Sequence, residues 1–244
     1  MDIYAYSNDT AYAKNPSLFP IYLYDNTIYN DLPYLLNFDT LKRSISSLRE
    51  SYDANQISAN FHNMYNWHTF YKTQFHEFYS IQDYLNLHNK FQKLSKQHQL
   101  KLQNKFRFEM LKNHFDTYTL SIVRNNPEIH FAIFYPPYSV LSYQLMHEQS
   151  YFKEVIKFKH YIHQQLSQYS NVSLYDFQVA QEITTELNHY KDISHYSEDI
   201  NHWILLQIKK KNYLVTNENI NKTLEEFHNY TLGYKTPKRN ASEY

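Results

Sequence analysis

The residues best suited to chemistry stand together near the carboxyl end of the chain, in the stretch NHYKDISHYSEDINHWILLQI (residues 188–208). Within it Asp192 precedes His195 by three residues, and a helix is predicted to follow from Glu198. A carboxylate beside an imidazole can hold the ring in one tautomer, so that the ring accepts a proton from a hydroxyl nucleophile. Asp192 and His195 are therefore the candidate catalytic pair.

A simpler interpretation of the same residues is an ordinary helix entrance. Ser194 or Ser197 would then cap the helix, and His195 would be a surface residue. An isolated Asp-x-x-His pattern favours this simpler interpretation. The elements before and after the pattern favour the catalytic one, because the pair follows a strand–helix–strand unit and precedes an amphipathic helix.

Two apolar runs frame that unit. IHFAIFYPP (residues 129–137) is nearly continuous in apolar residues, as a buried parallel strand should be, and its prolines end it. A long amphipathic helix is predicted over 139–168, and NVSLYDF (residues 171–177) reads as a second buried strand. The unit implies parallel strands with a right-handed crossover. Open sheets of this kind place their sites at the carboxyl edge of the strands.

The rest of the chain is predicted to form mostly helices around the strand–helix–strand unit. Helices are expected over 41–52, 81–98, about 100–125, 198–210 and 217–230, with a short strand at 21–24. Residues 53–80 read as a loop entering a short helix, and residues 178–190 as a short helix or loop. The expected fold class is α/β, with three layers in which helices flank a mostly parallel sheet. We expect one domain over 1–232 and a polar tail over 233–244.

Composition excludes several classes of site. The chain has one glycine, Gly233. At least two glycines are needed for a P-loop, a Rossmann fingerprint or a Gly-x-Ser-x-Gly elbow. It has no cysteine, which excludes disulfides, cysteine-based zinc sites and thiol nucleophiles. Its 24 basic and 24 acidic residues balance, so no nucleic-acid partner is expected.

The histidines and aromatic residues are explained without a ligand. His62, His68 and His76 cluster, and His189 and His202 flank His195, but no His-Glu-x-x-His motif occurs. Scattered surface histidines are favoured over a metal site, and no cofactor is expected. The aromatic stretch 61–79 could stack sugars, although core packing is the favoured interpretation.

No run of about 18 apolar residues predicts a transmembrane helix. The amino terminus lacks the basic start and apolar core of a secretory signal. The sequence as written therefore predicts a cytoplasmic location, or an envelope-associated one if an upstream segment exists.

Three segments in a fixed order carry a family resemblance: FAIFYPPYSVLSYQLM, VSLYDF and YKDISHYSEDINHWIL. They resemble the carboxyl-terminal half of the SGNH (GDSL-like) hydrolase and acyltransferase superfamily, whose last block is an Asp-x-x-His before the final helix. YLLNFDTLKRSISSLR is similar to a middle stretch of one bacterial group that is found with cell-envelope polysaccharide genes. The resemblance covers roughly 19–208. It implies that Asp192 orients the imidazole and that His195 acts as base.

The chain departs from that family where the nucleophile should be. The family's first block is Gly-Asp-Ser or Gly-Ser-Ser, and no Gly-x-Ser occurs here. Asn60 and Asn63 are candidates for the asparagine of the third block. Ser7 and Ser139 are substitute nucleophiles outside any matching motif. We therefore expect a chain that begins after the first strands of the fold.

Two functions remain open at this point. The first is an esterase or O-acyltransferase that acts on a carbohydrate or acyl-ester substrate of the cell envelope, inactive if it lacks a nucleophile. The second is a non-catalytic remnant of the fold that binds a glycan or a protein. The sequence does not indicate the oligomeric state.

Overall fold

The computed structural model describes residues 6–7, 29, 32, 36–53 and 75–235. The chain divides into two compact units, one formed by 1–8 with 71–244 and the other by 9–70. Much of the second unit lies outside the described residues, as does the short strand predicted at 21–24. The single domain expected over 1–232 therefore stays a prediction.

Most of the described residues of the second unit belong to helix α3 (Phe38–Asp53). The helix predicted over 41–52 is confirmed, and it begins three residues earlier than expected. Asn37 explains the earlier start, because its side-chain Oδ1 accepts the N–H of Thr40 at 2.7 Å and so caps the first turn.

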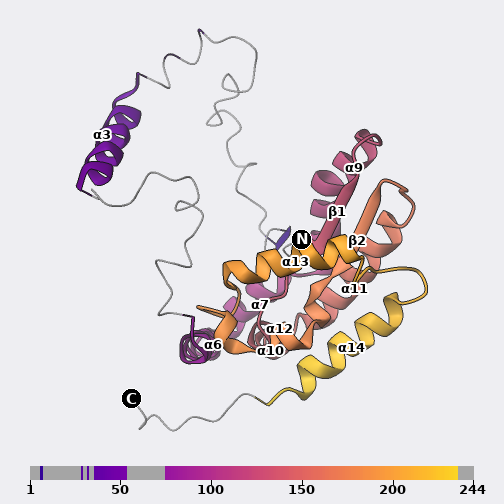
Figure 1. The fold of residues 1–244 in the computed structure, drawn as a ribbon. Coiled ribbons are helices and arrows are strands. Elements are labelled where there is room, and N and C mark those ends of the chain that lie inside the picture. Colours follow the sequence, from indigo (N-terminus) through magenta and orange to yellow (C-terminus); the bar gives the residue numbers. More distant parts are fainter. Residues whose placement is uncertain (1–5, 8–28, 30–31, 33–35, 54–74, 236–244) are drawn as a thin grey trace. The chain divides into compact units, whose positions relative to one another are not determined.

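A parallel strand–helix–strand unit forms the centre of the larger unit (Figure 1). β1 (Phe131–Tyr135) pairs with β2 (Val172–Asp176), with Phe131 opposite Val172 and Tyr135 opposite Asp176. Both predicted strands and their parallel pairing are confirmed. The two form the only sheet among the described residues, so the described chain is mixed α/β and mostly helical.

The prediction of one long helix over 139–168 is wrong, because the chain forms two helices in this range. These are α10 (Val140–Glu148) and α11 (Phe152–Leu166). Ser150 lies between them with a φ of 62°, in the left-handed region where a right-handed helix cannot continue. The apolar positions of both helices face buried surroundings, so their pattern gave no sign of the break.

Side chains from the two faces of the sheet enter different apolar clusters, as alternation along a strand requires. Ile133 and Leu174 pack with buried residues of α11, such as Phe158 and Ile162. Phe134 and Tyr175 pack on the other face with Ile204 and its neighbours of α13 (Glu198–Lys210). Helices therefore cover both faces of the two strands.

The remaining helices surround this centre and differ in detail from those predicted. The helix expected over 81–98 begins at Glu77 and ends at Gln92, and that expected over 100–125 is divided into four pieces. Helix α13 matches its predicted bounds, and the last helix begins and ends three residues late. The observed elements are α6 (Glu77–Gln92), α7 (Lys96–Lys105), α8 (Phe108–His114), η5 (Phe115–Leu120), α9 (Ser121–Asn125), η6 (Phe177–Val179), α12 (Gln181–Thr184), η7 (Leu187–His189) and α14 (Ile220–Gly233).

None of the helices in the described ranges combines the length and the apolar character needed to cross a membrane.

Candidate functional site

Asp192 and His195 lie in a short closed loop between η7 and α13. An antiparallel bridge between Tyr190 and Tyr196 closes the loop at its base. The N–H of Lys191 donates to the carbonyl of His195 at 3.1 Å within it. The candidate pair is thus held on a hairpin-like turn rather than on the helix that follows.

The structure brings the two side chains together. Nδ1 of His195 lies 2.7 Å from Oδ2 of Asp192. The other carboxylate oxygen, Oδ1, accepts the backbone N–H groups of Ser194 and His195, each at 2.8 Å. With Nδ1–H donating to the carboxylate, Nε2 is the ring nitrogen that can accept a proton. The His195 side chain is 63% exposed and that of Asp192 27%.

The hydrogen bonds decide the charge state of Asp192. Burial by itself would raise the pKa of this carboxyl. The backbone N–H groups of His195 and Ser194, together with the His195 ring, outweigh burial and hold the pKa below its ordinary value. Asp192 is therefore charged at neutral pH and can stabilise a protonated His195.

Two side chains of α6 fix the loop from one side. Ser80 is fully buried, and its hydroxyl lies 3.2–3.5 Å from the carbonyl oxygens of Leu187, Tyr190 and Asp192. Asp83, one turn later, accepts the N–H of Ile193 at 3.2 Å. Burial raises the pKa of the Asp83 carboxyl, and the nearby Asp192 charge raises it further.

The segment that follows β1 fixes the loop from another side. Ser139 donates both its N–H (3.1 Å) and its hydroxyl (2.8 Å) to the carbonyl of Ile193. The hydroxyl of Tyr190 donates to the carbonyl of Pro137 at 2.7 Å. These contacts place the loop beside the carboxyl end of β1, the edge at which open parallel sheets carry their sites.

The pair opens onto a cleft of about 720 Å³. This volume lies within the range of about 300–1,000 Å³ that is typical of ligand pockets. The loop 192–195 forms one wall, α7 forms another, and α6 and α10 contribute further side chains. The cleft therefore has room for a substrate next to His195.

The substitute nucleophiles differ in their surroundings. Ser139 is fully buried and its hydroxyl is engaged with Ile193, so it serves the loop's structure and is not free to attack a substrate. Ser7 is buried and lines the same cleft as His195. Asn60 and Asn63 lie outside the described residues.

The interpretation of this stretch as an ordinary helix entrance is confirmed only for the position of Ser197. Ser197 occupies the N-cap position of α13, but its side chain makes no capping hydrogen bond. Ser194 instead donates its hydroxyl to Asp192 at 3.2 Å, within the loop. The short loop is thus organised around the Asp192 carboxylate.

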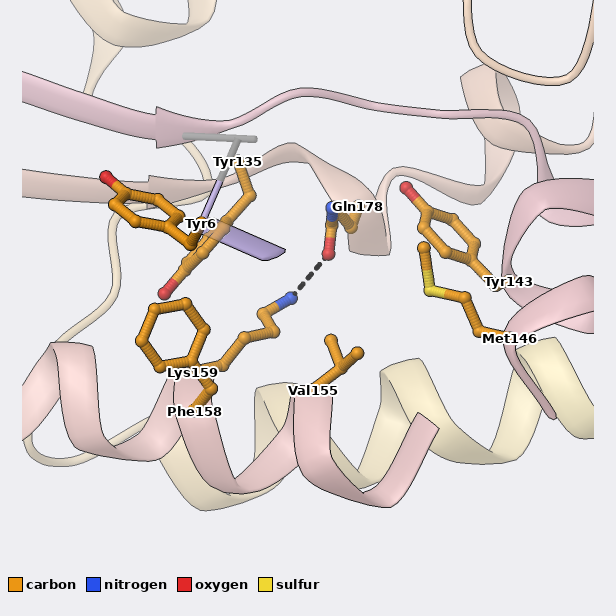
Figure 2. A pocket seen from close by; sticks show the side chains of 8 residues that line it. All are labelled: Tyr6, Tyr135, Tyr143, Met146, Val155, Phe158, Lys159 and Gln178. Atoms are coloured by element: carbon orange, nitrogen blue, oxygen red, sulfur yellow. Dashed lines mark hydrogen bonds between the residues drawn. The ribbon is translucent and has the colours of Figure 1, made fainter. Parts of the chain in front are cut away.

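A second hollow lies under the sheet, around the buried side chain of Lys159 (Figure 2). Its volume is about 10 Å³, which is close to the room needed by one water molecule and too small for a substrate. The Lys159 ammonium forms an ion pair with the Asp176 carboxylate at 2.6 Å. It also donates a hydrogen bond to Oε1 of Gln178 at 2.9 Å, which Figure 2 draws as a dashed line. This hollow belongs to the core and not to a binding site.

No metal site emerges within the described ranges, where no group of three or more His, Asp or Glu side chains is placed to hold an ion. His62 and His68 lie outside those ranges, as do residues 61–74 of the aromatic stretch.

Comparison with known proteins adds no relative: no family model, no curated protein and no solved structure matches this chain.

Sequence reasoning missed the groups that hold and surround the pair. Ser80 and Asp83 are three residues apart on α6. In the sequence nothing distinguishes them from the other polar residues of a partly exposed helix. The cleft wall formed by α7 was also missed, because that helix has no buried residue from which a packing pattern could be read.

Proposed function

We propose that the chain carries the acid–base half of an SGNH-like esterase or O-acyltransferase that acts on a carbohydrate or acyl-ester substrate. The observation that supports this most is the 2.7 Å contact between His195 Nδ1 and Asp192 Oδ2 at the wall of a cleft of substrate size. The placement of the loop beside the carboxyl end of β1 supports it further. A three-layer SGNH-like fold is part of the proposal.

The proposed chemistry assigns one role to each member of the pair. His195 Nε2 accepts the proton of an attacking hydroxyl and returns it to the leaving alcohol. Asp192 holds the imidazole in the tautomer with its proton on Nδ1, and stabilises the imidazolium once it forms. Ser7 is the candidate nucleophile, because it is the one of the two substitutes expected from the sequence that lines the same cleft as His195.

Hydrolysis of p-nitrophenyl acetate by the purified chain tests this assignment. We expect His195→Ala to lower kcat/KM by about a hundredfold or more, the usual contribution of a general base. Asp192→Asn should lower it as well, because the amide no longer fixes the productive tautomer. His202→Ala is the matched control, since His202 is exposed on α13 and outside the cleft.

A fluorophosphonate probe followed by peptide mapping identifies the nucleophile independently. Labelling at Ser7 that is lost in His195→Ala supports the assignment. A wild-type chain that neither hydrolyses the ester nor reacts with the probe contradicts the enzymatic proposal. Hydrolysis that survives His195→Ala contradicts the role of that residue.

A further inference from the structure

One face of α7 lines the same cleft as the catalytic pair. His98, Lys101, Leu102 and Lys105 all line the cleft, and their three- and four-residue spacing puts them on the same side of the helix. This face is therefore presented to whatever the cleft holds, and its composition bears on the ligand.

The face combines positive charge with apolar surface. Lys101 and Lys105 are one turn apart, so their ammonium groups can reach a common anion. Among the described residues, neither lysine has an acidic partner in an ion pair. His98 is exposed on the same face, and its Nδ1 lies 2.8 Å from the Ser95 hydroxyl.

The two acidic residues of the cleft, Asp83 and Asp192, are held by the loop rather than by the lysines of α7. Asp192 is committed to His195 and to two backbone N–H groups. Asp83 accepts the N–H of Ile193, and burial raises the pKa of its carboxyl. The positive charge of the cleft is thus concentrated on α7, and its two lysines are left to bind an anion.

The remaining lining is largely apolar and comes from several elements. It offers a surface for an alkyl or acyl chain, which the hydrophobic effect would drive into the cleft. The apolar residues of the whole lining are Leu87, Leu94, Leu102, Phe106, Leu145, Tyr151 and Ile193.

We propose that the cleft binds a phosphate-bearing amphiphile, with its acyl chain against the apolar lining and its phosphate against Lys101 and Lys105. Two ammonium groups one turn apart match a doubly charged group better than a neutral sugar hydroxyl. The ligand is a substrate only under the proposed function, on which this inference rests. In that case the inference narrows the substrate class to an anionic acyl ester.

Calorimetric titration of the full chain with octyl phosphate tests the inference without any need for turnover. We expect octyl phosphate to bind about tenfold or more tightly than either octyl glucoside or inorganic phosphate, because each of these lacks one half of the match. Butyl phosphate should bind more weakly than octyl phosphate, since it buries less apolar surface.

The double variant Lys101→Gln with Lys105→Gln should abolish the preference for octyl phosphate over octyl glucoside. Lys90→Gln with Lys93→Gln is the matched control, because these two lysines are also exposed but lie outside the cleft. The inference is overturned by equal binding of the charged and neutral amphiphiles, by a preference that survives the first double variant, or by inorganic phosphate binding as tightly as octyl phosphate.

The two proposals fail separately. Octyl phosphate that binds to both wild type and His195→Ala, in a chain without esterase activity, supports the ligand class and contradicts the catalytic role. Ester hydrolysis that depends on His195 but shows no preference for anionic amphiphiles supports the catalytic role and overturns the ligand class.

Discussion

At the scale of single residues, the candidate site depends on Asp192 accepting several hydrogen bonds at once. One oxygen accepts two backbone N–H groups and the other contacts the ring of His195. The loop that carries this carboxylate is in turn fixed by Ser80, Asp83 and Ser139. The geometry of the pair therefore reflects side chains that are distant in sequence.

Ser80→Ala tests the most buried of these contacts. Removal of the hydroxyl leaves the carbonyl groups of Leu187, Tyr190 and Asp192 without that donor, so we expect a loss of about 1–3 kcal/mol in the free energy of unfolding. Urea unfolding measures it. Ser167→Ala, at an exposed helix end, is the control and should cost about 0.5 kcal/mol or less. Equal losses in both variants would contradict the anchoring role of Ser80.

His147 gives the chain a pH dependence of defined sign. Burial, assisted by the nearby His228, lowers the pKa of His147 to about 4. The unfolded chain has a histidine pKa of about 6.5, so as pH falls from about 6.5 to about 4 the unfolded state takes up a proton that the folded state does not. The free energy of unfolding should therefore fall in that window, by about 1–2 kcal/mol once partial exposure is allowed for.

His147→Gln isolates this contribution, because glutamine can keep a hydrogen bond to the Thr231 hydroxyl, which lies 3.0 Å from the histidine. Urea unfolding near pH 7 and near pH 5 should show a smaller difference in the variant than in the wild type. Identical pH dependence in the two proteins would rule out His147 as the source.

At the scale of elements, α11 is tied to β2 by a charged pair inside the core. Lys159 on α11 and Asp176 at the end of β2 are 2.6 Å apart, with side chains 2% and 1% exposed. The lysine ammonium also lies 4.1 Å from the centre of the Phe227 ring on α14. Burial lowers the pKa of Lys159, and the Asp176 charge opposes that shift. The pair therefore joins a strand and two helices at one point.

Lys159→Met should be strongly destabilising, because it leaves the Asp176 carboxylate buried without its partner. We expect a loss of about 3–5 kcal/mol in the free energy of unfolding. The double variant Lys159→Met with Asp176→Asn should recover most of that loss, since the amide oxygen can still accept the N–H of Gln178. Chemical denaturation of the variants measures the coupling, and additive losses would contradict a mutual pair.

The elements also show what apolar patterning can predict. Both strands and α13 were found from their patterns, because each presents a sustained apolar run or face with clear ends. The break at Ser150 was missed, since the apolar residues on both sides of it are buried and so continue the pattern. The divided helices α7 and α8 were missed for a related reason: their boundary at Phe106 and Arg107 carries no glycine or proline.

At the scale of the whole molecule, a chain with one glycine must bend with other residues. Ser150, Lys211 and Tyr213 adopt positive φ values of 62°, 57° and 60° among the described residues. Each such non-glycine residue carries a backbone cost of about 1–2 kcal/mol. Gly233 has an open environment around its α-carbon and takes no part in such a turn.

Lys211→Gly should therefore stabilise the protein. Lys211 ends α13 in the left-handed conformation, which glycine adopts without steric cost, and we expect a gain of about 0.5–1 kcal/mol. Lys210→Gly, at the last residue of the helix, gains no such relief and should instead cost about 0.5 kcal/mol. Thermal unfolding should move the two Tm values in opposite directions, and a shared direction would contradict the argument.

The candidate pair was predictable from sequence because its two members are three residues apart in one loop. The parts of the site that come from elsewhere were not. Ser80 and Asp83 lie more than 100 residues away along the chain from the loop they fix. Lys101 and Lys105 sit on a helix without buried residues. Their roles depend on how α6 and α7 fold against the loop, which local spacing does not encode.

The turn from Asp192 to His195 supplies one part of its geometry locally, since the carboxylate binds the backbone and the ring of the residues that follow it. Transfer of this tetrapeptide to another protein would show how much of the contact these local hydrogen bonds maintain by themselves. Grafted into a hairpin of an unrelated protein, Asp-Ile-Ser-His should retain its carboxylate–imidazole contact but would lack the neighbouring cleft. Comparison of the two proteins would separate the intrinsic reactivity of the imidazole from the contribution of substrate binding.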